Sequence, residues 1–299
     1  MKKIAIIGAG VMGLSAAYHL LKKDYDVDIY EAAKEPGGMA AHFDFDGLSI
    51  ERFYHFICKT DYDTFELLEE LNIQDELKWK ETSMGYFMNN QVNKWGDPIS
   101  LLKFPKIGII TKIRYGLLAF ISTKIKRWDS LENLSAEKWL KKWVGAKGYD
   151  ILWKKLMELK FHEHSGNISA KWLWTRIKRT GASRKSIFQE ELGYISGGSE
   201  TLVNTLVNQI ENMGGNIFYS SPPKKIFSVS GKVTGLQVMN KKIDYDNIIS
   251  TVPTPYIESF VSCLNSDEMN GYKSIKNIGV VCVLFKLSKI PIPPITGVG

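Results

Sequence analysis

The chain has 299 residues, of which 44% are hydrophobic and 24% charged, and its formal net charge is +7 at pH 7. This composition excludes a disordered or low-complexity chain and favours a globular protein of about two domains. No apolar run approaches the ~18 residues of a membrane-spanning helix, and three cysteines without paired spacing exclude a disulfide-rich secreted scaffold.

The amino terminus carries the pattern of a nucleotide-binding βαβ unit. Residues 3–7 are apolar and predict a buried strand, and the glycine-rich turn 8–13 follows them. Leucines and alanines then recur at helical spacing, and residues 27–30 predict a second strand that ends at Glu31. A strand, a glycine turn, a helix and a second strand ending in an acid together form the dinucleotide-binding fingerprint.

Each part of this fingerprint has a physical role. Gly8 permits the tight turn, Gly10 lets a pyrophosphate approach the backbone, and Gly13 lets the helix pack closely on the strand. The helix amino terminus presents free N–H groups and a positive dipole end to phosphates. Glu31 can accept a hydrogen bond from a ribose hydroxyl. The pattern therefore predicts nucleotide binding; the alternative is a structural glycine turn in an ordinary βαβ unit.

The next segments predict a second close approach of backbone to a ligand. Gly37 and Gly38 follow the acid-ending strand, and residues 43–50 alternate around an Asp-Gly pair, which predicts a hairpin. A helix is expected at about 61–71. Between them, Arg52 can hold an anionic group and His55 can donate or accept a proton, which makes them our candidate catalytic residues. The alternative is a surface pair of Arg52 with Glu51 and a partly buried histidine.

From about residue 79 the pattern becomes mainly helical and rich in tryptophan, up to about residue 189. We expect most of these tryptophans to form a core. The α/β pattern then returns, with a glycine-rich turn before a helix near 199, strands near 216–219, 225–229 and 233–238, and a buried strand near 246–253.

Residues 103–127 carry seven basic and no acidic side chains, interleaved with apolar ones. Three interpretations are open: an interfacial helix on an anionic membrane, cations around a phosphorylated substrate, or a packed helix with solvated lysines. No nucleic-acid-binding module accompanies the charge, so we expect no nucleic-acid partner. His162 and His164 alternate, but no third ligand is evident nearby, so no metal site is expected.

Several separated motifs now coincide in order. The glycine fingerprint is joined by the Gly37-Gly38 pair, by a GGxxxL segment at 197–202 and by an STxP strand end at 250–253. In these motifs the chain resembles the FAD-dependent amine oxidase and protoporphyrinogen oxidase-like oxidoreductases. The resemblance implies an α/β fold: a doubly wound, Rossmann-like FAD-binding domain formed by residues 1–78 and 190–256. It also implies an inserted, mainly helical cap or substrate domain at 79–189, and a truncated start of a substrate-domain sheet at 257–299.

The resemblance also implies FAD as cofactor and hydride transfer from a substrate to flavin N5. A porphyrinogen, a polyisoprenoid, an amine and a sugar nucleotide all remain open as substrates. We expect a cytoplasmic protein, with a peripheral contact to the inner membrane surface through residues 103–127 as one option. The cofactor-binding residues that it implies are Gly8, Ala9, Gly10, Met12, Gly13, Glu31, Ala32, Gly37, Gly38, Met39 and Pro223.

Three departures from the family pattern bear on this expectation. Pro223 stands where the family has a valine whose N–H contacts the adenine, and proline has no such donor. Asp24 replaces a glycine, with a small expected effect. The family's carboxyl-terminal flavin segment is absent from this sequence. Two alternatives therefore stay open: a flavin-dependent sugar-nucleotide mutase similar to UDP-galactopyranose mutase, and a truncated, non-catalytic nucleotide-binding protein.

Overall fold

The computed structural model describes residues 2–88, 90–277, 279–289 and 297–298. The chain divides into two compact units. Unit 1 comprises Met1–His55, Glu66–Leu77 and Ile195–Val283; unit 2 comprises Phe56–Phe65, Lys78–Tyr194 and Leu284–Gly299. Unit 1 thus extends beyond residue 256, where the sequence places its end.

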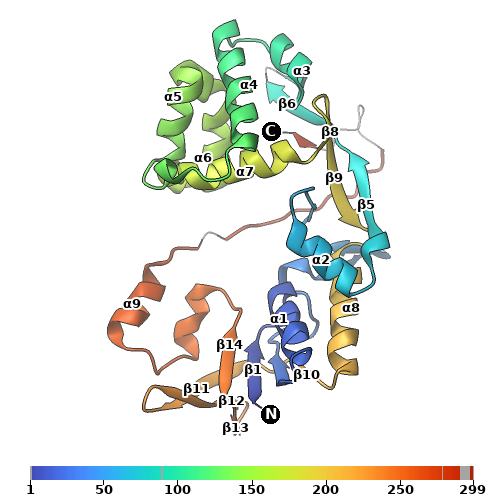
Figure 1. The fold of residues 1–299 in the computed structure, drawn as a ribbon, viewed down its shortest axis with the longest axis vertical. Helices are drawn as coiled ribbons and strands as arrows, with labels where there is room; N and C mark the ends of the chain where they lie inside the picture. The colour runs from blue at the N-terminus through green and yellow to red at the C-terminus, as the bar shows by residue number, and fades with distance from the viewer. Residues whose placement is uncertain (1, 89, 278, 290–296, 299) are drawn as a thin grey trace. The chain divides into compact units, whose positions relative to one another are not determined.

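Unit 1 is built on a four-stranded parallel sheet in the order β10-β2-β1-β14 (Figure 1). The strands are β1 (Lys3–Ile7), β2 (Asp26–Tyr30), β10 (Asn216–Phe218) and β14 (Asn247–Ser250). In its centre Ile6 lies opposite Ile29 on one side and Ile249 on the other. The near-continuous apolar run of β1 is typical of a parallel strand that is covered on both faces.

Two different layers cover this sheet. The helices α1 (Val11–Leu21) and α8 (Ser199–Asn212) pack together on one side. On the other side, Ala5 and Ile7 pack against Leu236 of an antiparallel sheet formed by β11 (Pro223–Val229), β12 (Lys232–Val238) and β13 (Lys241–Asp244). The strands expected near 216–219, 225–229, 233–238 and 246–253 are therefore confirmed.

The predicted hairpin is also confirmed, as β3 (His42–Phe45) and β4 (Leu48–Glu51), and the predicted helix forms α2 (Tyr62–Glu70). The segment after β14 is helical at first. It forms a short 3-10 turn at Thr254–Ser259 and α9 (Ser266–Ser274), and the described residues between 275 and 289 belong to no strand. Among the described residues of 257–299, the two-residue β15 (Gly297–Val298) beside β6 is a strand, and the sheet expected from 257 stays a prediction.

Unit 2 combines helices with strands that the sequence does not predict. Its helices are α3 (Pro98–Lys103), α4 (Ile109–Lys124), α5 (Ala136–Tyr149), α6 (Lys155–Phe161) and α7 (Ala170–Ala182). Strands accompany them: the three-stranded sheet β5-β9-β8, and the hairpin β6–β7. Their bounds are β5 (Leu77–Glu81), β6 (Met84–Met88), β7 (Gln91–Trp95), β8 (Arg184–Ser186) and β9 (Gln189–Ile195).

The tryptophans form the core of the helical part of unit 2, as expected. Trp139 and Trp174 are buried with Leu118, Leu140 and Leu173. Trp128 contacts both buried tryptophans edge to face, at ring-centroid distances of 5.6 and 6.0 Å. Large aromatic side chains in such contacts stabilise a core beyond their buried area alone.

Candidate functional site

The glycine turn connects β1 to α1 at the carboxyl edge of the parallel sheet. Gly8 has a φ of +105°, which favours glycine, and its N–H donates to the Tyr30 carbonyl at 2.8 Å. A Cβ on Gly13 would lie 1.9 Å from the Gly8 carbonyl oxygen. Only glycine therefore lets the helix start so close to the strand.

Gly10 differs from these two glycines because its Cβ position is open. The nearest atoms to such a Cβ are the Gly37 oxygen and the Gly38 Cα, both at 4.0 Å. Gly10 precedes α1 with a φ of −71° and has no side-chain cap, and the first turn of α1 contains no acidic residue. The first N–H groups of α1 are thus left for an external acceptor.

The Gly37-Gly38 pair forms the opposite side of this open space. Gly37 has a φ of +109°, donates its N–H to the Ala9 carbonyl at 2.8 Å and forms a bridge with Gly10. Met39 and Met12 are 66% and 70% exposed, so neither side chain fills the turn. The residues present therefore fit a pyrophosphate between two backbone segments, with the dipole of α1 favouring its negative charge.

The Glu31 carboxylate reaches the same turn. It accepts hydrogen bonds from the N–H groups of Ala9, at 2.7 Å, and Ala33, at 2.8 Å. A carboxylate has about four acceptor positions, so capacity is left for a ribose hydroxyl. The Ala9 N–H is thus already used by Glu31. Ala32 lies beside them and is exposed.

The Glu51 carboxylate, rather than a cation, organises the segment with the candidate catalytic residues. It accepts a hydrogen bond from the Ser199 N–H at 2.7 Å and from the His55 N–H at 3.1 Å, and lies 3.3 Å from the His55 ring nitrogen Nδ1. Burial would raise the pKa of Glu51, but the hydrogen bonds from Ser199 and His55 outweigh it and hold this pKa below its ordinary value. The surface pair of Arg52 with Glu51 is therefore wrong.

Arg52 is exposed and lies at the side of a hollow between the β3–β4 hairpin and α8. Its backbone N–H donates to the Ala41 carbonyl at 3.0 Å. His42, Ser49 and Glu200 line the same hollow. Within the described residues, no ion pair to the Arg52 side chain is seen, so its charge is available for an anionic group.

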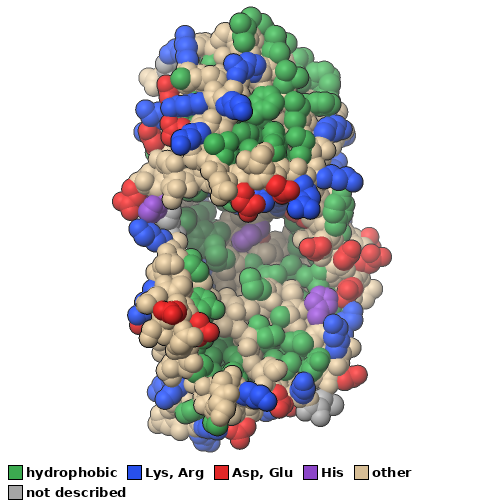
Figure 2. All heavy atoms as spheres, turned by 60° about the vertical axis from the view of Figure 1, so that its left-hand side comes forward, with side chains coloured by type: hydrophobic (Ala, Val, Ile, Leu, Met, Phe, Trp, Pro, Cys, Tyr) green, Lys and Arg blue, Asp and Glu red, His purple; other side chains and the backbone are tan. Residues whose placement is uncertain are grey.

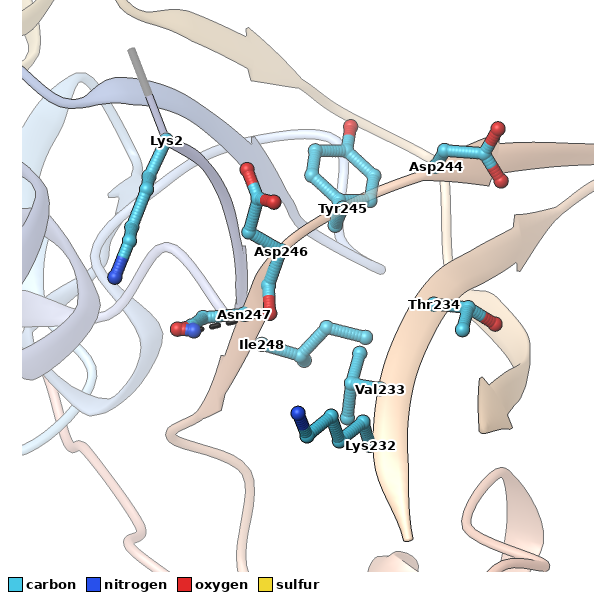
Figure 3. Close-up of a pocket in the computed structure, with 9 residues that line it drawn as sticks. All are labelled: Lys2, Lys232, Val233, Thr234, Asp244, Tyr245, Asp246, Asn247 and Ile248. Carbon is cyan, nitrogen blue, oxygen red and sulfur yellow. Dashed lines mark hydrogen bonds between the residues drawn. The ribbon is translucent and has the colours of Figure 1, made fainter. Parts of the chain in front are cut away.

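A second hollow lies at the other end of the sheet and belongs to a different environment (Figure 3). Its lining residues are Lys2, Lys232, Val233, Thr234, Asp244, Tyr245, Asp246, Asn247 and Ile248. Lys2 and Asp246 precede β1 and β14, so this hollow faces the amino ends of the strands. Ligands of open parallel sheets bind at the carboxyl ends, which makes the glycine turn the candidate site.

The histidines at 162 and 164 do not lie on a strand. They belong to a 3-10 segment after α6, where His164 lies 3.5 Å from the carboxylate of Glu163. Across the part of the chain that the structure describes, no three metal-ligating side chains come together.

The family model of the flavin containing amine oxidoreductases matches residues 12–293. The chain belongs to this family. The resemblance that the motifs indicate is confirmed, and so is FAD as the cofactor.

Individual relatives agree with this assignment. The chain is 25% identical to a 15-cis-phytoene desaturase of Synechococcus elongatus, over 89% of this chain and 58% of the relative. It is 34% identical to a zeta-carotene desaturase of Solanum lycopersicum, over 45% of this chain and 22% of the relative. An oxidoreductase structure from Methanosarcina mazei shares the fold, with a TM-score of 0.69 and 18% identity. The match covers 91% of this chain and 64% of the other.

The chain spans less than two thirds of the desaturase that it matches along most of its length, and of the similar structure. Within the described residues, no helix combines the length and apolar character needed to cross a bilayer.

Sequence reasoning did not identify two residues of this site. Ser199 donates its backbone N–H to Glu51 and its hydroxyl to the Ala40 carbonyl at 2.9 Å. Thr251 donates its hydroxyl to the Ile7 carbonyl at 2.9 Å, directly below the turn. The STxP motif contains Thr251, and the GGxxxL motif contains Ser199, but neither motif alone gives the hydrogen bonds.

Proposed function

We propose that this flavoprotein oxidises a small-molecule substrate, and that unit 1 holds the adenosine diphosphate half of its FAD. The open Cβ position of Gly10, opposite Gly37-Gly38 and above the uncapped start of α1, is the observation that carries the proposal. When bound, FAD supplies a hydride acceptor at its N5 atom.

The backbone of this chain would do most of the binding. The N–H groups at the start of α1, with Gly10 and Gly13, would hold the pyrophosphate, and Gly38 would face it from the other side. The Glu31 carboxylate would accept a hydrogen bond from a ribose hydroxyl while it keeps its hydrogen bond from the Ala9 N–H. Met12, Ala32 and Met39 would contact the cofactor from the exposed rim, and Pro223, at the start of β11, would contact the adenine without a backbone donor.

Arg52 and His55 are the proposed catalytic residues. Arg52 would hold an anionic group at the side of its hollow. His55, fixed by Glu51 through both its backbone and its ring, would donate or accept a proton. We propose unit 2 as the cap or substrate domain.

The substrate class that we favour is a polyisoprenoid, because the two curated relatives described above are desaturases of phytoene and zeta-carotene. Porphyrinogens, amines and sugar nucleotides are the other classes to assay. The three relatives all carry oxidoreductase or desaturase names, which gives no support to the sugar-nucleotide mutase.

The test is to purify the chain, measure its flavin absorbance band and titrate it with FAD. The proposal predicts about one FAD per chain, and reduction of the bound flavin by a substrate of the favoured class. A chain that takes up no FAD would contradict cofactor binding. A chain that binds FAD but is reduced by no substrate class would favour the non-catalytic alternative, and turnover only with pre-reduced flavin and a sugar nucleotide would favour the mutase.

A further inference from the structure

The helices α3 and α4 of unit 2 expose an unusual number of large apolar side chains. These side chains, which we call the α3–α4 patch, are 47–70% exposed: Ile99, Leu102, Ile109, Ile110, Ile113, Leu117 and Phe120. Figure 2 shows a broad hydrophobic area on the upper part of the view, with Lys and Arg side chains at its border. Contiguous apolar patches of this kind mark interaction sites.

The patch is a face of a well-anchored helix and not a loosely packed end. On the opposite side of α4, Leu118 and Ser122 are buried, and the Trp174 indole donates to the Ser122 carbonyl at 3.2 Å. Residues 109, 113, 117 and 120 recur every three or four positions and therefore form one stripe along the helix. Packing fixes which face of α4 points outward.

The segment that carries the patch has charges of one sign. Between Pro98 and Trp128 the sequence has seven basic residues and no acidic one. Lys103, at the end of α3, and Lys124, at the end of α4, are exposed, and Lys124 also lies over the Phe120 ring at 5.6 Å from its centroid. Long cationic side chains can keep their stems along an apolar surface while the charge stays in water.

We propose that the α3–α4 patch docks on an anionic phospholipid surface, with α4 lying in the plane of the interface. An apolar stripe with a cationic border is the arrangement of an interfacial helix: the apolar side chains enter the acyl boundary and the cations meet the lipid phosphates. With α4 lying in the plane of the interface, the proposed contact is peripheral. The inference concerns unit 2 and does not rest on the flavin chemistry.

Charge complementarity favours an anionic phospholipid surface over a second copy of the chain as the partner of the patch. In a self-complementary contact the basic border of one copy would face that of the other, and like charges would repel. A protein partner would need acidic groups around an apolar groove, whereas an anionic bilayer supplies both features over a wide area.

The test is co-sedimentation of the 299-residue chain with vesicles, comparing phosphatidylcholine alone with a mixture that contains phosphatidylglycerol. We expect binding to the anionic vesicles that falls as salt is raised, and much weaker binding to the neutral ones. Ile110→Glu with Ile113→Glu should lower partitioning at least about tenfold. Lys103→Glu with Lys124→Glu should lower partitioning onto the anionic vesicles by more than about fivefold for each lysine replaced.

Ile187→Glu is the matched control, because Ile187 is 67% exposed in the same unit but lies outside the patch. It should bind vesicles as the unchanged chain does, and circular dichroism and the flavin band should match for all variants. Equal binding to both vesicle types, no binding to anionic vesicles, or patch variants that still bind would each overturn the proposal. A patch variant that changes the mass in solution without changing vesicle binding would show self-association instead.

Discussion

Gly10 and Gly13 lie in one turn but have different roles. Gly13 is needed by the fold, because its Cβ would collide with the Gly8 carbonyl oxygen. Gly10 has an ordinary φ and open space at its Cβ, so the fold itself tolerates a side chain there. Substitutions at these two positions can therefore distinguish an effect on stability (Gly13) from an effect on cofactor binding (Gly10).

We predict that Gly13→Ala lowers the free energy of unfolding by about 1–3 kcal/mol. Gly10→Val should leave the melting temperature of the cofactor-free chain nearly unchanged and weaken FAD binding at least about tenfold. Thermal unfolding and FAD titration measure the two effects. Gly166→Ala is the control, since nothing lies within 4 Å of its Cβ position. Unchanged FAD affinity in Gly10→Val would contradict the pyrophosphate site.

Asp28 is the centre of a buried polar network beneath the sheet. Its carboxylate accepts from Tyr245 at 2.6 Å and Asn216 at 2.9 Å, and pairs with Lys3 at 3.0 Å. Burial would raise the pKa of Asp28, but the hydrogen bonds from Tyr245, Asn216 and Lys3 outweigh it and hold the pKa below its ordinary 3.8. A depressed pKa stabilises the fold above pH 3.8, and this contribution is lost as the pH falls through the folded-state value.

Asp28→Asn should therefore lower the free energy of unfolding by about 1–3 kcal/mol at pH 7. The difference from the unchanged chain should shrink as the pH falls below about 4, because both chains then lack the charge. Urea unfolding at several pH values measures this. Asp63→Asn, at an exposed position of α2, should show no comparable effect, and a difference that is independent of pH would contradict the role of the charge.

The sequence predicts the backbone turn of the candidate site more completely than it predicts the side-chain contacts. Strand, turn and acid follow a local pattern, so Gly8, Gly13 and Glu31 are recognisable within thirty-one residues. His55 is a local partner of Glu51, but Ser199 is far away in the sequence and meets β4 only because α8 starts beside the hairpin. Adjacency in the sequence points instead to Arg52 as the partner of the Glu51 carboxylate.

At the level of elements, local pattern predicts strands of unit 1 but not those of unit 2. The β6–β7 hairpin has two five-residue strands with three aromatic residues between them, inside the range that the sequence predicts to be mainly helical. Asn90 at its turn has a φ of +59°, a conformation that asparagine tolerates. Short aromatic strands can be told from helices only by their pairing, which is a tertiary feature.

The extended run from Val280 to Leu287 is an exposed apolar element. Val281 is 88% exposed and Phe285 is 79% exposed. Exposed apolar segments of this kind are sites of aggregation. We predict that Val281→Lys with Phe285→Lys raises the soluble fraction severalfold and leaves FAD affinity unchanged.

Static light scattering and FAD titration of this double variant are the measurements. Replacement of exposed Tyr62, at 65% exposure, by Lys serves as the control for adding a charge elsewhere. A double variant that loses its fold, seen as a lower melting temperature, would show instead that the run is packed in solution.

On the scale of the whole molecule, each unit has its own hydrophobic core. The core of unit 1 lies between the parallel sheet and β11–β13, and that of unit 2 among α4, α5 and α7. Sequence reasoning gave unit 1 as a discontinuous domain, but the extension to Val283 follows from contacts of residues such as Phe260 with Ile226, which no local pattern reveals.

We predict two calorimetric transitions, because two separate cores unfold as separate cooperative units. FAD at a hundred times its Kd should raise the free energy of unfolding of unit 1 by about 2.7 kcal/mol. The unfolding transition of unit 2 should be less affected. The Asp28→Asn variant identifies the unit 1 transition by lowering it. Equal shifts of both transitions on adding FAD would contradict a cofactor held by unit 1 alone.

The most direct measurement is an experimental structure of the chain with FAD bound. We predict that the pyrophosphate lies against the N–H groups at the start of α1, within hydrogen-bond distance, with a ribose hydroxyl on the Glu31 carboxylate. A cofactor found instead in the hollow beside Asp246 and Lys232, or a glycine turn left without contact to the phosphates, would contradict the account.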